Sequence, residues 1–177
     1  MNNYFFDFDL AGFWDDDEYY IREYTDDPLT PEKVSFVEAA LGYKLPASYI
    51  ELMRHRNGGA PVNNCHRSSS ETSWAADHVA MTGFLSIGAT KTYSLCGRFG
   101  SQFMIDEWGY PRLGIYFADS PSAGHDMLCL DYSSRGKGGE PRVVHVDQER
   151  DYAVTHIADS FQAFVRGLQP AAAFPPG

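Results

Sequence analysis

The chain has 177 residues, of which 44% are hydrophobic and 21% charged, so it is long enough to bury the core of one globular domain but short for two. Its 24 acidic residues against 14 lysines and arginines give a formal net charge of −10, which argues against nonspecific binding to nucleic acid or an anionic membrane and favours basic partners. Nine of these acids and one arginine lie in residues 1–27, so most of the acidity belongs to the N-terminal segment.

Targeting signals and disulfides are not expected. The first ten residues lack the basic start and the small-residue cleavage site of a secretory signal. The longest uncharged run before the tail, about residues 79–90, falls short of the roughly 20 apolar residues that cross a bilayer. Three cysteines, Cys65, Cys96 and Cys129, form neither an even set nor a CxxC pair, which argues against a disulfide framework or a zinc site. We therefore expect a cytoplasmic protein without cofactor or metal.

The N-terminal third predicts an arm followed by two helices. Residues 1–27 mix acids with aromatics, a composition that indicates an acidic aromatic arm laid over the domain. A first helix is predicted from Thr30 and Pro31 to Gly42, because Thr caps helices, Pro suits the first position and Gly suits the exit. A second helix is predicted from about Pro46 to the Asn57-Gly58-Gly59 exit.

The middle of the chain predicts a long loop and then strands. Residues 61–77 are polar and rich in Ser and Asn, with Trp74 as a single aromatic, which indicates a loop. The alternation of apolar residues beyond it is typical of half-buried strands. The strands are predicted at residues 113–118, 127–131 and 142–146, with weaker candidates at 79–85 and 93–95. Residues 133–141 have the composition of a hairpin turn, so antiparallel pairing is expected.

The C-terminal part predicts a closing helix over residues 155–168, because Ile157, Phe161, Phe164 and Leu168 recur at helical spacing. Residues 169–177 are expected to form a flexible tail. Together the elements predict an α+β fold, in which an N-terminal helix pair and a C-terminal helix pack against a single antiparallel sheet.

Catalytic motifs are incomplete. Ser122, His125 and Asp126 lie close together in a loop between two strands, but no Gly-x-Ser-x-Gly elbow surrounds the serine. Asp106 and Glu107 would face opposite ways on a strand, which argues against an acid/base pair. The Gly-rich run at 135–139 lacks the Ser or Thr that a phosphate-binding loop needs after its lysine. A small hydrolase that uses Ser122, His125 and Asp126 therefore stays an alternative hypothesis.

Several ordered motifs resemble the SUKH superfamily, the group named partly for the yeast regulators Smi and Knr. The resemblance spans about residues 28–168 and depends on the order and spacing of motifs that are individually common. The motifs are Leu41-Gly42-Tyr43-Lys44-Leu45-Pro46-x-x-Tyr49, Asn57-Gly58-Gly59, Glu107-Trp108-Gly109-Tyr110-Pro111, Ile115 to Ala118, Gly124-His125-Asp126, Leu130-Asp131-Tyr132, Gly139-Glu140-Pro141-x-Val143-Val144 and Ile157-Ala158-Asp159-Ser160-Phe161-x-x-Phe164.

The resemblance implies an α+β domain that binds other proteins and carries no shared catalytic residues. Many bacterial relatives are immunity proteins that neutralise polymorphic toxins, often nucleases, and eukaryotic relatives act in regulatory assemblies. The resemblance implies either role here. An acidic inhibitor would be steered electrostatically to the basic surface of a nuclease toxin. A regulatory or signalling adaptor is the alternative.

Partner-binding residues are expected among exposed aromatics and acids on loops and on the arm. Trp108 is equally compatible with a place in the core, because tryptophan is heavily buried on average. The candidate residues are Trp14, Asp15, Asp16, Asp17, Trp74, Glu107, Trp108, Asp119, His125 and Asp126.

Overall fold

Five helices and seven strands form within residues 3–176, which are the residues that the computed structural model describes. Two short 3-10 turns, Gln148–Arg150 and Ala171–Ala173, complete the elements. The helices are α1 (Glu18–Tyr24), α2 (Pro31–Leu41), α3 (Ala47–His55), α4 (Ser101–Trp108) and α5 (Phe161–Arg166). The strands are β1 (Cys65–Arg67), β2 (His78–Ala80), β3 (Gly83–Phe84), β4 (Gly114–Asp119), β5 (Asp126–Asp131), β6 (Arg142–Asp147) and β7 (Ala153–Ala158).

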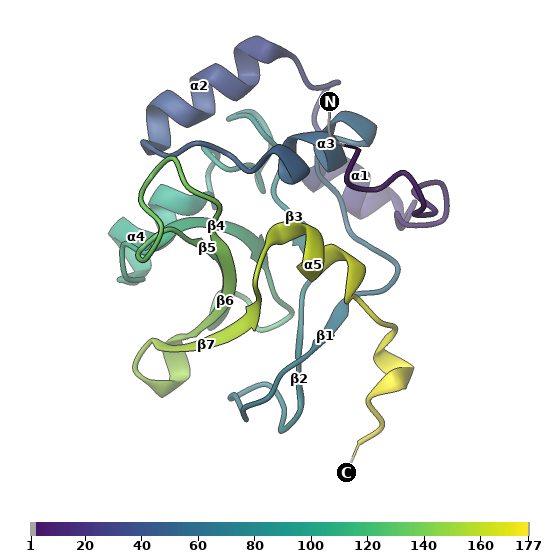
Figure 1. Ribbon diagram of the computed structural model, residues 1–177, viewed down its shortest axis with the longest axis vertical. Coiled ribbons are helices and arrows are strands. Elements are labelled where there is room, and N and C mark those ends of the chain that lie inside the picture. The colour runs from purple at the N-terminus through teal and green to yellow at the C-terminus, as the bar shows by residue number, and fades with distance from the viewer. Residues whose placement is uncertain (1–2, 177) are drawn as a thin grey trace.

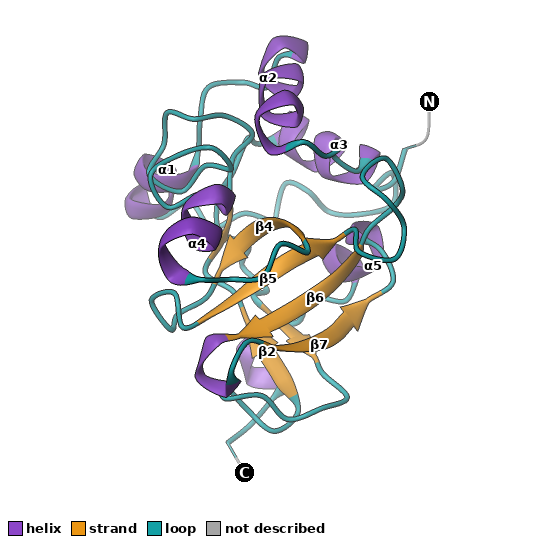
Figure 2. Ribbon diagram, turned by 90° about the vertical axis from the view of Figure 1, so that its left-hand side faces the viewer, coloured by secondary structure: helices purple, strands orange, loops and turns teal. Residues whose placement is uncertain are grey.

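Strands β3 to β7 form one antiparallel sheet in chain order, and β1 pairs with β2 in a second, two-stranded sheet. The α+β class and the antiparallel pairing are therefore confirmed, while the small sheet adds to the single sheet that was predicted. The larger sheet is strongly curved, with α5 lying on its concave side (Figure 1). Helix α4 lies on the opposite side (Figure 2).

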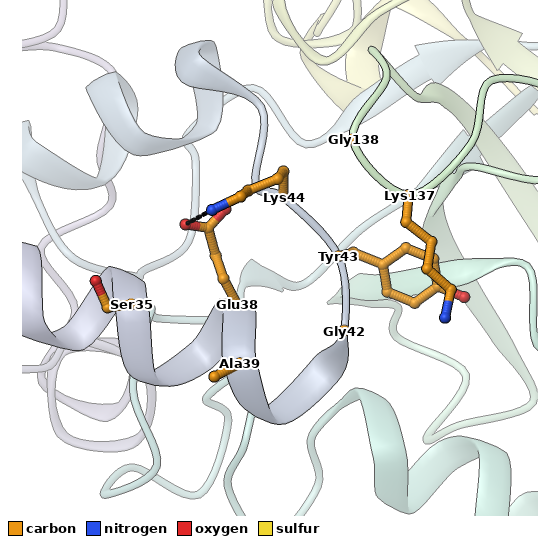
Figure 3. Close-up of a pocket in the computed structure, with 8 residues that line it drawn as sticks. All are labelled: Ser35, Glu38, Ala39, Gly42, Tyr43, Lys44, Lys137 and Gly138. Carbon is orange, nitrogen blue, oxygen red and sulfur yellow. Dashed lines mark ion pairs between the residues drawn. The ribbon is translucent and has the colours of Figure 1, made fainter.

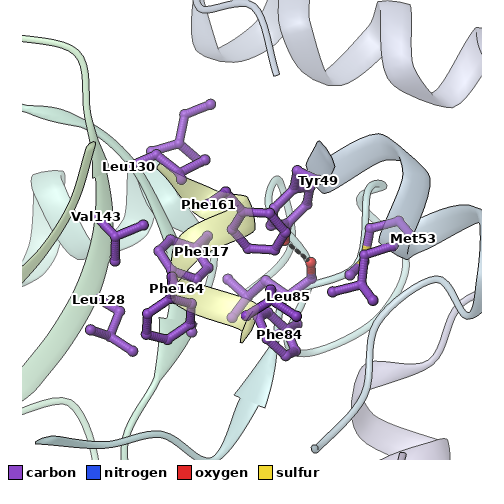
Figure 4. Close-up of a cluster of buried hydrophobic side chains, with 14 of the residues drawn as sticks. Tyr49, Met53, Phe84, Leu85, Phe117, Leu128, Leu130, Val143, Phe161 and Phe164 are labelled. Carbon is purple, nitrogen blue, oxygen red and sulfur yellow. Dashed lines mark hydrogen bonds between the residues drawn. The ribbon is translucent and has the colours of Figure 1, made fainter. Parts of the chain in front are cut away.

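The main core lies between the larger sheet and helices α3 and α5 (Figure 4). Phe117 of β4 contacts Phe161 and Phe164 of α5 edge to face, with ring centroids 5.6 Å apart in both pairs. Tyr49 of α3 packs 4.8 Å from Phe161 and donates its hydroxyl hydrogen to the Leu85 carbonyl. Edge-to-face contacts add to the stabilisation that burial of the rings provides.

The second face of the sheet is buried too, under helix α4 and the segment after it. Tyr116, Cys129 and Val144 point to this side and pack with Met104 of α4 and with Tyr110. The prediction of half-buried strands was therefore wrong, because alternate residues of β4, β5 and β6 face two apolar layers rather than one layer and solvent.

Helices α2 and α3 form where the residues at their ends predict them. Thr30 accepts a hydrogen bond from the Lys33 N–H and caps α2, and Gly42 ends it in the left-handed conformation with φ of 80°. Helix α3 follows Pro46. Its apolar side is buried and consists of Tyr49, Leu52 and Met53.

The predicted closing helix is shorter than expected. Its start, residues 155–158, belongs to strand β7, which pairs with β6 and leaves α5 to begin at Phe161 behind the cap Ser160. Apolar residues four positions apart, such as Ile157 and Phe161, also occur where a strand turns into a helix. Here Ile157 lies on the strand and Phe161 on the helix, and both side chains reach the same core.

Short elements account for the other differences. The predicted loop at residues 61–77 contains β1, and the weak strand at 79–85 divides between β2 and β3 in separate sheets. Residues 93–95 make only an isolated bridge between Ser86 and Ser94. Helices α1 and α4 were not predicted, and Glu107 lies on α4 instead of a strand.

The arm and the tail are packed against the domain. Phe5, Phe13 and Trp14 of the arm are buried in the main core. The tail, predicted to be flexible, pairs through Gln169 with β1 and buries Phe174, so that prediction was wrong as far as Phe174. The ends of the arm and tail, residues 1–2 and 177, lie outside the described residues.

The ring cluster predicts a large cost for losing one member. We expect Phe161→Ala to lower the free energy of unfolding by about 3 to 5 kcal/mol, because a fully buried ring is removed from a packed site. Denaturant unfolding measures the change, with Phe36→Ala as the control, since Phe36 on α2 is 54% exposed. A loss below about 1 kcal/mol in Phe161→Ala would contradict this packing.

Candidate partner-binding site

The structure brings three of the predicted binding residues together around one pocket. Trp108 ends helix α4, Asp119 ends strand β4, and His125 lies in the turn that follows, with its ring centroid 5.7 Å from that of Trp108. The cavity measures about 270 Å³ and is called the Asp119 pocket below. Its lining residues are Tyr93, Phe99, Phe103, Met104, Trp108, Asp119, Ala123, Gly124 and Met127.

A row of aromatic rings connects helix α1 to helix α4 along this pocket. Tyr24 of α1 stacks on Tyr93, with ring centroids 4.4 Å apart and planes inclined by 7°. Tyr93 contacts Phe99 at 5.7 Å, and Phe99 contacts Phe103 of α4 at 5.3 Å. Each ring is therefore held by a neighbour, which fixes the aromatic wall of the pocket.

Asp119 is the charged group of the pocket. Tyr24 Oη donates to its Oδ2 at 2.7 Å, whereas Oδ1 is shielded from solvent and has no hydrogen-bond partner among the described residues. Burial raises the pKa of Asp119 to about 7, against the opposing effect of the Tyr24 hydrogen bond and of nearby backbone N–H groups. The nearby charge of Asp126 adds to the rise. Asp119 therefore changes its charge close to neutral pH.

Gly124 allows Trp108 to approach the turn between β4 and β5. Its φ is 98°, and a Cβ atom there would lie 3.2 Å from the Trp108 ring. Tyr110 Oη donates to the Gly124 carbonyl at 2.6 Å, and Tyr152 Oη donates to the Trp108 carbonyl. These contacts hold the turn against α4 and so fix one side of the pocket.

The three aspartates of the arm lie at the start of helix α1. Asp17 caps the helix, and Asp16 pairs with Arg56 at 2.8 Å, while Asp15 and Asp17 form no ion pair within residues 3–176. Burial raises the pKa of Tyr20, and the charges of Asp15, Asp17 and the pocket carboxylate raise it further. The ring centroid of Tyr20 lies 6.2 Å from that of Tyr24, the first ring of the row, so the acids of the arm lie at the α1 end of this row.

Trp14 and Asp126 are buried, so their prediction as exposed binding residues was wrong. Trp14 is 5% exposed, packs against Phe84 in the main core, and donates its indole hydrogen to His55 Nδ1 at 3.2 Å. Asp126 is 1% exposed because it begins strand β5, where His145 of β6 lies beside it. A large ring removed from water and a buried carboxylate with a histidine partner both serve the core rather than a partner protein.

Ser122, His125 and Asp126 form no hydrogen-bonded Ser–His–Asp arrangement in the structure. Asp126 contacts His145 Nε2 at 2.6 Å and accepts a hydrogen bond from Ser120 at 2.7 Å. Ser122 Oγ accepts a hydrogen bond from the Asp126 backbone, and His125 Nδ1 instead lies 2.6 Å from a glutamate after β6. Burial opposes ionisation of Asp126, but the hydrogen bonds from His145, Ser122 and Ser120 outweigh it and lower its pKa.

The two remaining candidates lie outside the pocket lining. Glu107 is exposed on α4 beside Trp108. Trp74 is 41% exposed on the loop between β1 and β2. That loop is held by Ser73, whose N–H and Oγ both donate to the buried carboxylate of Asp147. Trp74 therefore belongs to a separate surface.

A second hollow lies between helix α2 and the β5–β6 hairpin (Figure 3). Its charged groups are already paired within the chain. Lys44 Nζ lies 3.7 Å from Glu38 Oε1, and Lys137 Nζ lies 5.6 Å from the centre of the Tyr43 ring (Figure 3). The Lys44 N–H donates to the Lys137 carbonyl, which ties the hairpin to the helix. The contacts in this hollow therefore hold two elements of the fold together, and its charged groups are less available to a ligand than the carboxyl of the Asp119 pocket.

A family model described as the SMI1 / KNR4 family (SUKH-1) matches residues 28–167. The chain belongs to this family. A search of curated proteins finds no significant match. The SUKH-1 match covers both sheets and helices α2 to α5, and leaves out the arm and helix α1. Tyr24, which holds Asp119, is thus contributed from outside the matched domain.

The described part of this SUKH-1 chain has neither a membrane-spanning helix nor a cluster of metal-binding side chains. None of its helices has the length and apolar character that a membrane span requires. Nor does any group of three His, Cys, Asp or Glu side chains in residues 3–176 have an arrangement that could hold a metal ion.

Several pocket residues were missed by the sequence analysis. Tyr93, Phe99 and Phe103 were not among the predicted site residues, although they form the aromatic wall. A usable signal was present in α4, since Met104 and Trp108 are four residues apart and Gly109 ends the helix in the left-handed conformation. Tyr24 offered no such signal, because it meets Asp119 across 95 positions of sequence.

The raised pKa of Asp119 predicts a pH-dependent effect of removing its charge. The folded protein keeps this proton up to about pH 7, whereas the unfolded chain loses it near pH 4, so wild-type stability falls as pH rises between these values. We therefore expect the free energy of unfolding of Asp119→Asn, relative to that of wild type, to be on the order of 2 kcal/mol higher at pH 8 than at pH 5. Unfolding of both proteins at the two pH values measures this difference.

The exposed acid Glu107 on the same side of the molecule provides the control. Glu107→Gln should change stability by a similar small amount at pH 5 and pH 8, because its carboxylate stays hydrated. If the stability effects of Asp119→Asn and Glu107→Gln depend on pH to the same extent, the Asp119 carboxyl is not shielded from solvent.

Proposed function

We propose that this SUKH-1 domain is a non-enzymatic protein-binding domain, and most concretely an immunity protein that binds and neutralises a basic toxin domain such as a nuclease. The observation that supports it best is a preformed aromatic pocket with a shielded carboxyl, next to acids that form no ion pair within residues 3–176. Glu107 lies beside this pocket, and Asp15 and Asp17 lie near its ring row. Surfaces that combine aromatic and charged groups in this way are typical of protein interfaces.

Charge supports a role in fast association. The chain has a formal net charge of −10, and a nuclease must be basic where it binds phosphates. Opposite charges steer two proteins together and can raise the association rate to about 10⁸ to 10⁹ M⁻¹s⁻¹ at low salt. Asp15, Asp16 and Asp17 at the start of α1 can act in this way, since they are exposed or half-buried, although Asp16 also pairs with Arg56.

The proposed compartment is the cytoplasm, where an immunity protein would meet a toxin before it acts. All three cysteines are free, which is compatible with a reducing compartment. A regulatory adaptor of the same family would use the same surface for another partner. The neighbouring gene discriminates between the roles, because a large secreted protein with a toxic C-terminal domain encoded beside this one favours immunity.

Inertness as an enzyme is the first testable consequence. We expect the purified protein to hydrolyse ester, peptide and nucleotide substrates no faster than its Ser122→Ala and His125→Ala variants, because Ser122 bonds to a backbone N–H and no histidine contacts it among the described residues. Initial rates with each substrate class measure this. Turnover that disappears in Ser122→Ala would instead favour the hydrolase alternative.

Binding kinetics test the proposed interface. With a partner found by co-purification or from the adjacent gene, we expect neutralising Asp15, Asp16 and Asp17 to Asn to lower the association rate and flatten its salt dependence, with little change in dissociation. Asn at position 17 can still cap α1. Trp108→Ala should raise the dissociation rate and cost on the order of 2 kcal/mol or more, as an aromatic residue at the centre of an interface does.

Two control variants locate the interface. Asp159→Asn changes an exposed acid beyond β7, at the edge of the sheet opposite to β3, and should leave association unchanged. Trp74→Ala removes the exposed tryptophan of the other surface and should leave dissociation unchanged. A larger effect of Trp74→Ala than of Trp108→Ala would move the interface to the β1–β2 loop. Binding that is equal at 50 mM and 500 mM salt would contradict electrostatic steering.

A further inference from the structure

We propose that the Asp119 pocket receives the guanidinium group of one arginine side chain from the protein partner, with the aromatic rings of the pocket against the cation and Asp119 as its counter-ion. The inference rests on the proposed protein-binding function and names the chemistry that its pocket recognises.

The lining of the pocket suits a flat organic cation. Four of the nine lining residues are aromatic, and the faces of aromatic rings attract cations within about 6 Å. One of these rings already holds a guanidinium, because the Cζ atom of Arg98 lies 5.1 Å from the centroid of Phe99. A ring of this lining can therefore hold a guanidinium group.

One oxygen of the Asp119 carboxyl group is buried and has no partner within residues 3–176. The Oδ2 atom accepts the hydrogen bond from Tyr24, whereas Oδ1 has no partner among the described residues. A charged donor that reaches Oδ1 would form a short charge-assisted hydrogen bond, and this buried oxygen would then have a partner. Guanidinium is more weakly hydrated than ammonium and stacks on rings, so an arginine is favoured over a lysine in this mostly apolar lining.

Size and charge favour a single side chain from a protein. The cavity of about 270 Å³ lies just below the roughly 300 to 1,000 Å³ of pockets that hold whole drug-sized ligands. A side chain that enters from a bound partner needs only its head group inside. The negative charge of the chain matches a basic partner surface that would supply such a residue.

Ionisation of Asp119 makes the recognition dependent on pH. With a pKa of about 7, Asp119 is mostly neutral at pH 6 and mostly charged at pH 8, and only the charged form attracts a cation. Helix α4 lines the pocket with apolar side chains only. The other titratable or charged groups around the pocket are Tyr20 and Tyr24 of α1, Tyr93 and Arg98 before α4, Glu107 of α4, Asp126 of β5 and His125 of the β4–β5 turn.

The test titrates the full chain with N-acetyl-arginine methylamide, and follows the Trp and backbone signals by NMR. We expect saturable binding with a Kd on the order of millimolar, since one cation with stacking is a small ligand. We expect about tenfold tighter binding at pH 8 than at pH 6, from the fraction of charged Asp119. The capped citrulline isostere, which is neutral, should not bind, and capped lysine should bind more weakly than capped arginine.

Variants separate the pocket from its surroundings. Asp119→Asn, which keeps an acceptor for the Tyr24 hydroxyl, should weaken binding at pH 8 at least tenfold and remove the pH dependence. Trp108→Leu is a second pocket variant that keeps the charge, and should also weaken binding. Asp159→Asn, which changes an exposed acid beyond β7 and far from the pocket lining, should leave it unchanged. Because histidines change charge between pH 5 and 8, the titration is repeated in His125→Gln, where the pH dependence should persist.

Three results would overturn the inference. They are equal binding of the arginine and citrulline probes, unchanged binding in folded Asp119→Asn, and loss of the pH dependence in His125→Gln. Failure of the proposed function gives a different pattern, in which no protein partner is found while capped arginine still binds the wild-type pocket. If a protein partner binds wild type, Asp119→Asn and Trp108→Leu equally well, protein binding stands and the pocket assignment fails.

Discussion

Burial of the larger sheet on both faces is the constraint on which the rest of the structure depends. Strands β4 to β6 place apolar side chains on both sides, so neither face can remain in water without a large cost. Helices α3 and α5 cover one face together with the arm, which leaves α4 and the segment after it to cover the other. Helix α4 covers its face of the sheet incompletely. The Asp119 pocket is the space that remains between α4 and the β4–β5 turn.

Polar contacts at the end of the sheet position the loops. Asp126 and Asp147 face each other across β5 and β6, and both are 1% exposed. Each carboxylate is satisfied by a loop or a neighbouring strand, Asp126 by Ser120 and His145, and Asp147 by Ser73. A buried charge that lost such a partner would be costly, so these contacts restrict the conformations of the β4–β5 turn and the β1–β2 loop.

Local signals predicted local structure, and long-range pairing decided what they missed. Helices α2 and α3 were predicted because caps and glycine exits act within a few residues. Strand β7 was taken for helix, because its pairing with β6 and its turn into α5 are tertiary features. The SUKH resemblance identified the domain that the family model confirms. For the site, composition pointed to acids and aromatics, but only strand register buries Asp126 and only packing of the arm buries Trp14.

The hydrogen bond from Tyr24 to Asp119 joins two parts of the chain with different origins in the family comparison. Asp119 lies inside the segment that the SUKH-1 family model matches, whereas Tyr24 lies in the segment before it. The matched domain thus supplies the acid, and the segment before it supplies the hydroxyl that bonds to one of its oxygens and leaves the other without a partner in the described part of the chain. A change confined to the segment before the matched domain is therefore enough to alter the chemistry of the pocket, because the loss of one hydroxyl there would leave both oxygens of a buried acid without a side-chain partner among residues 3–176.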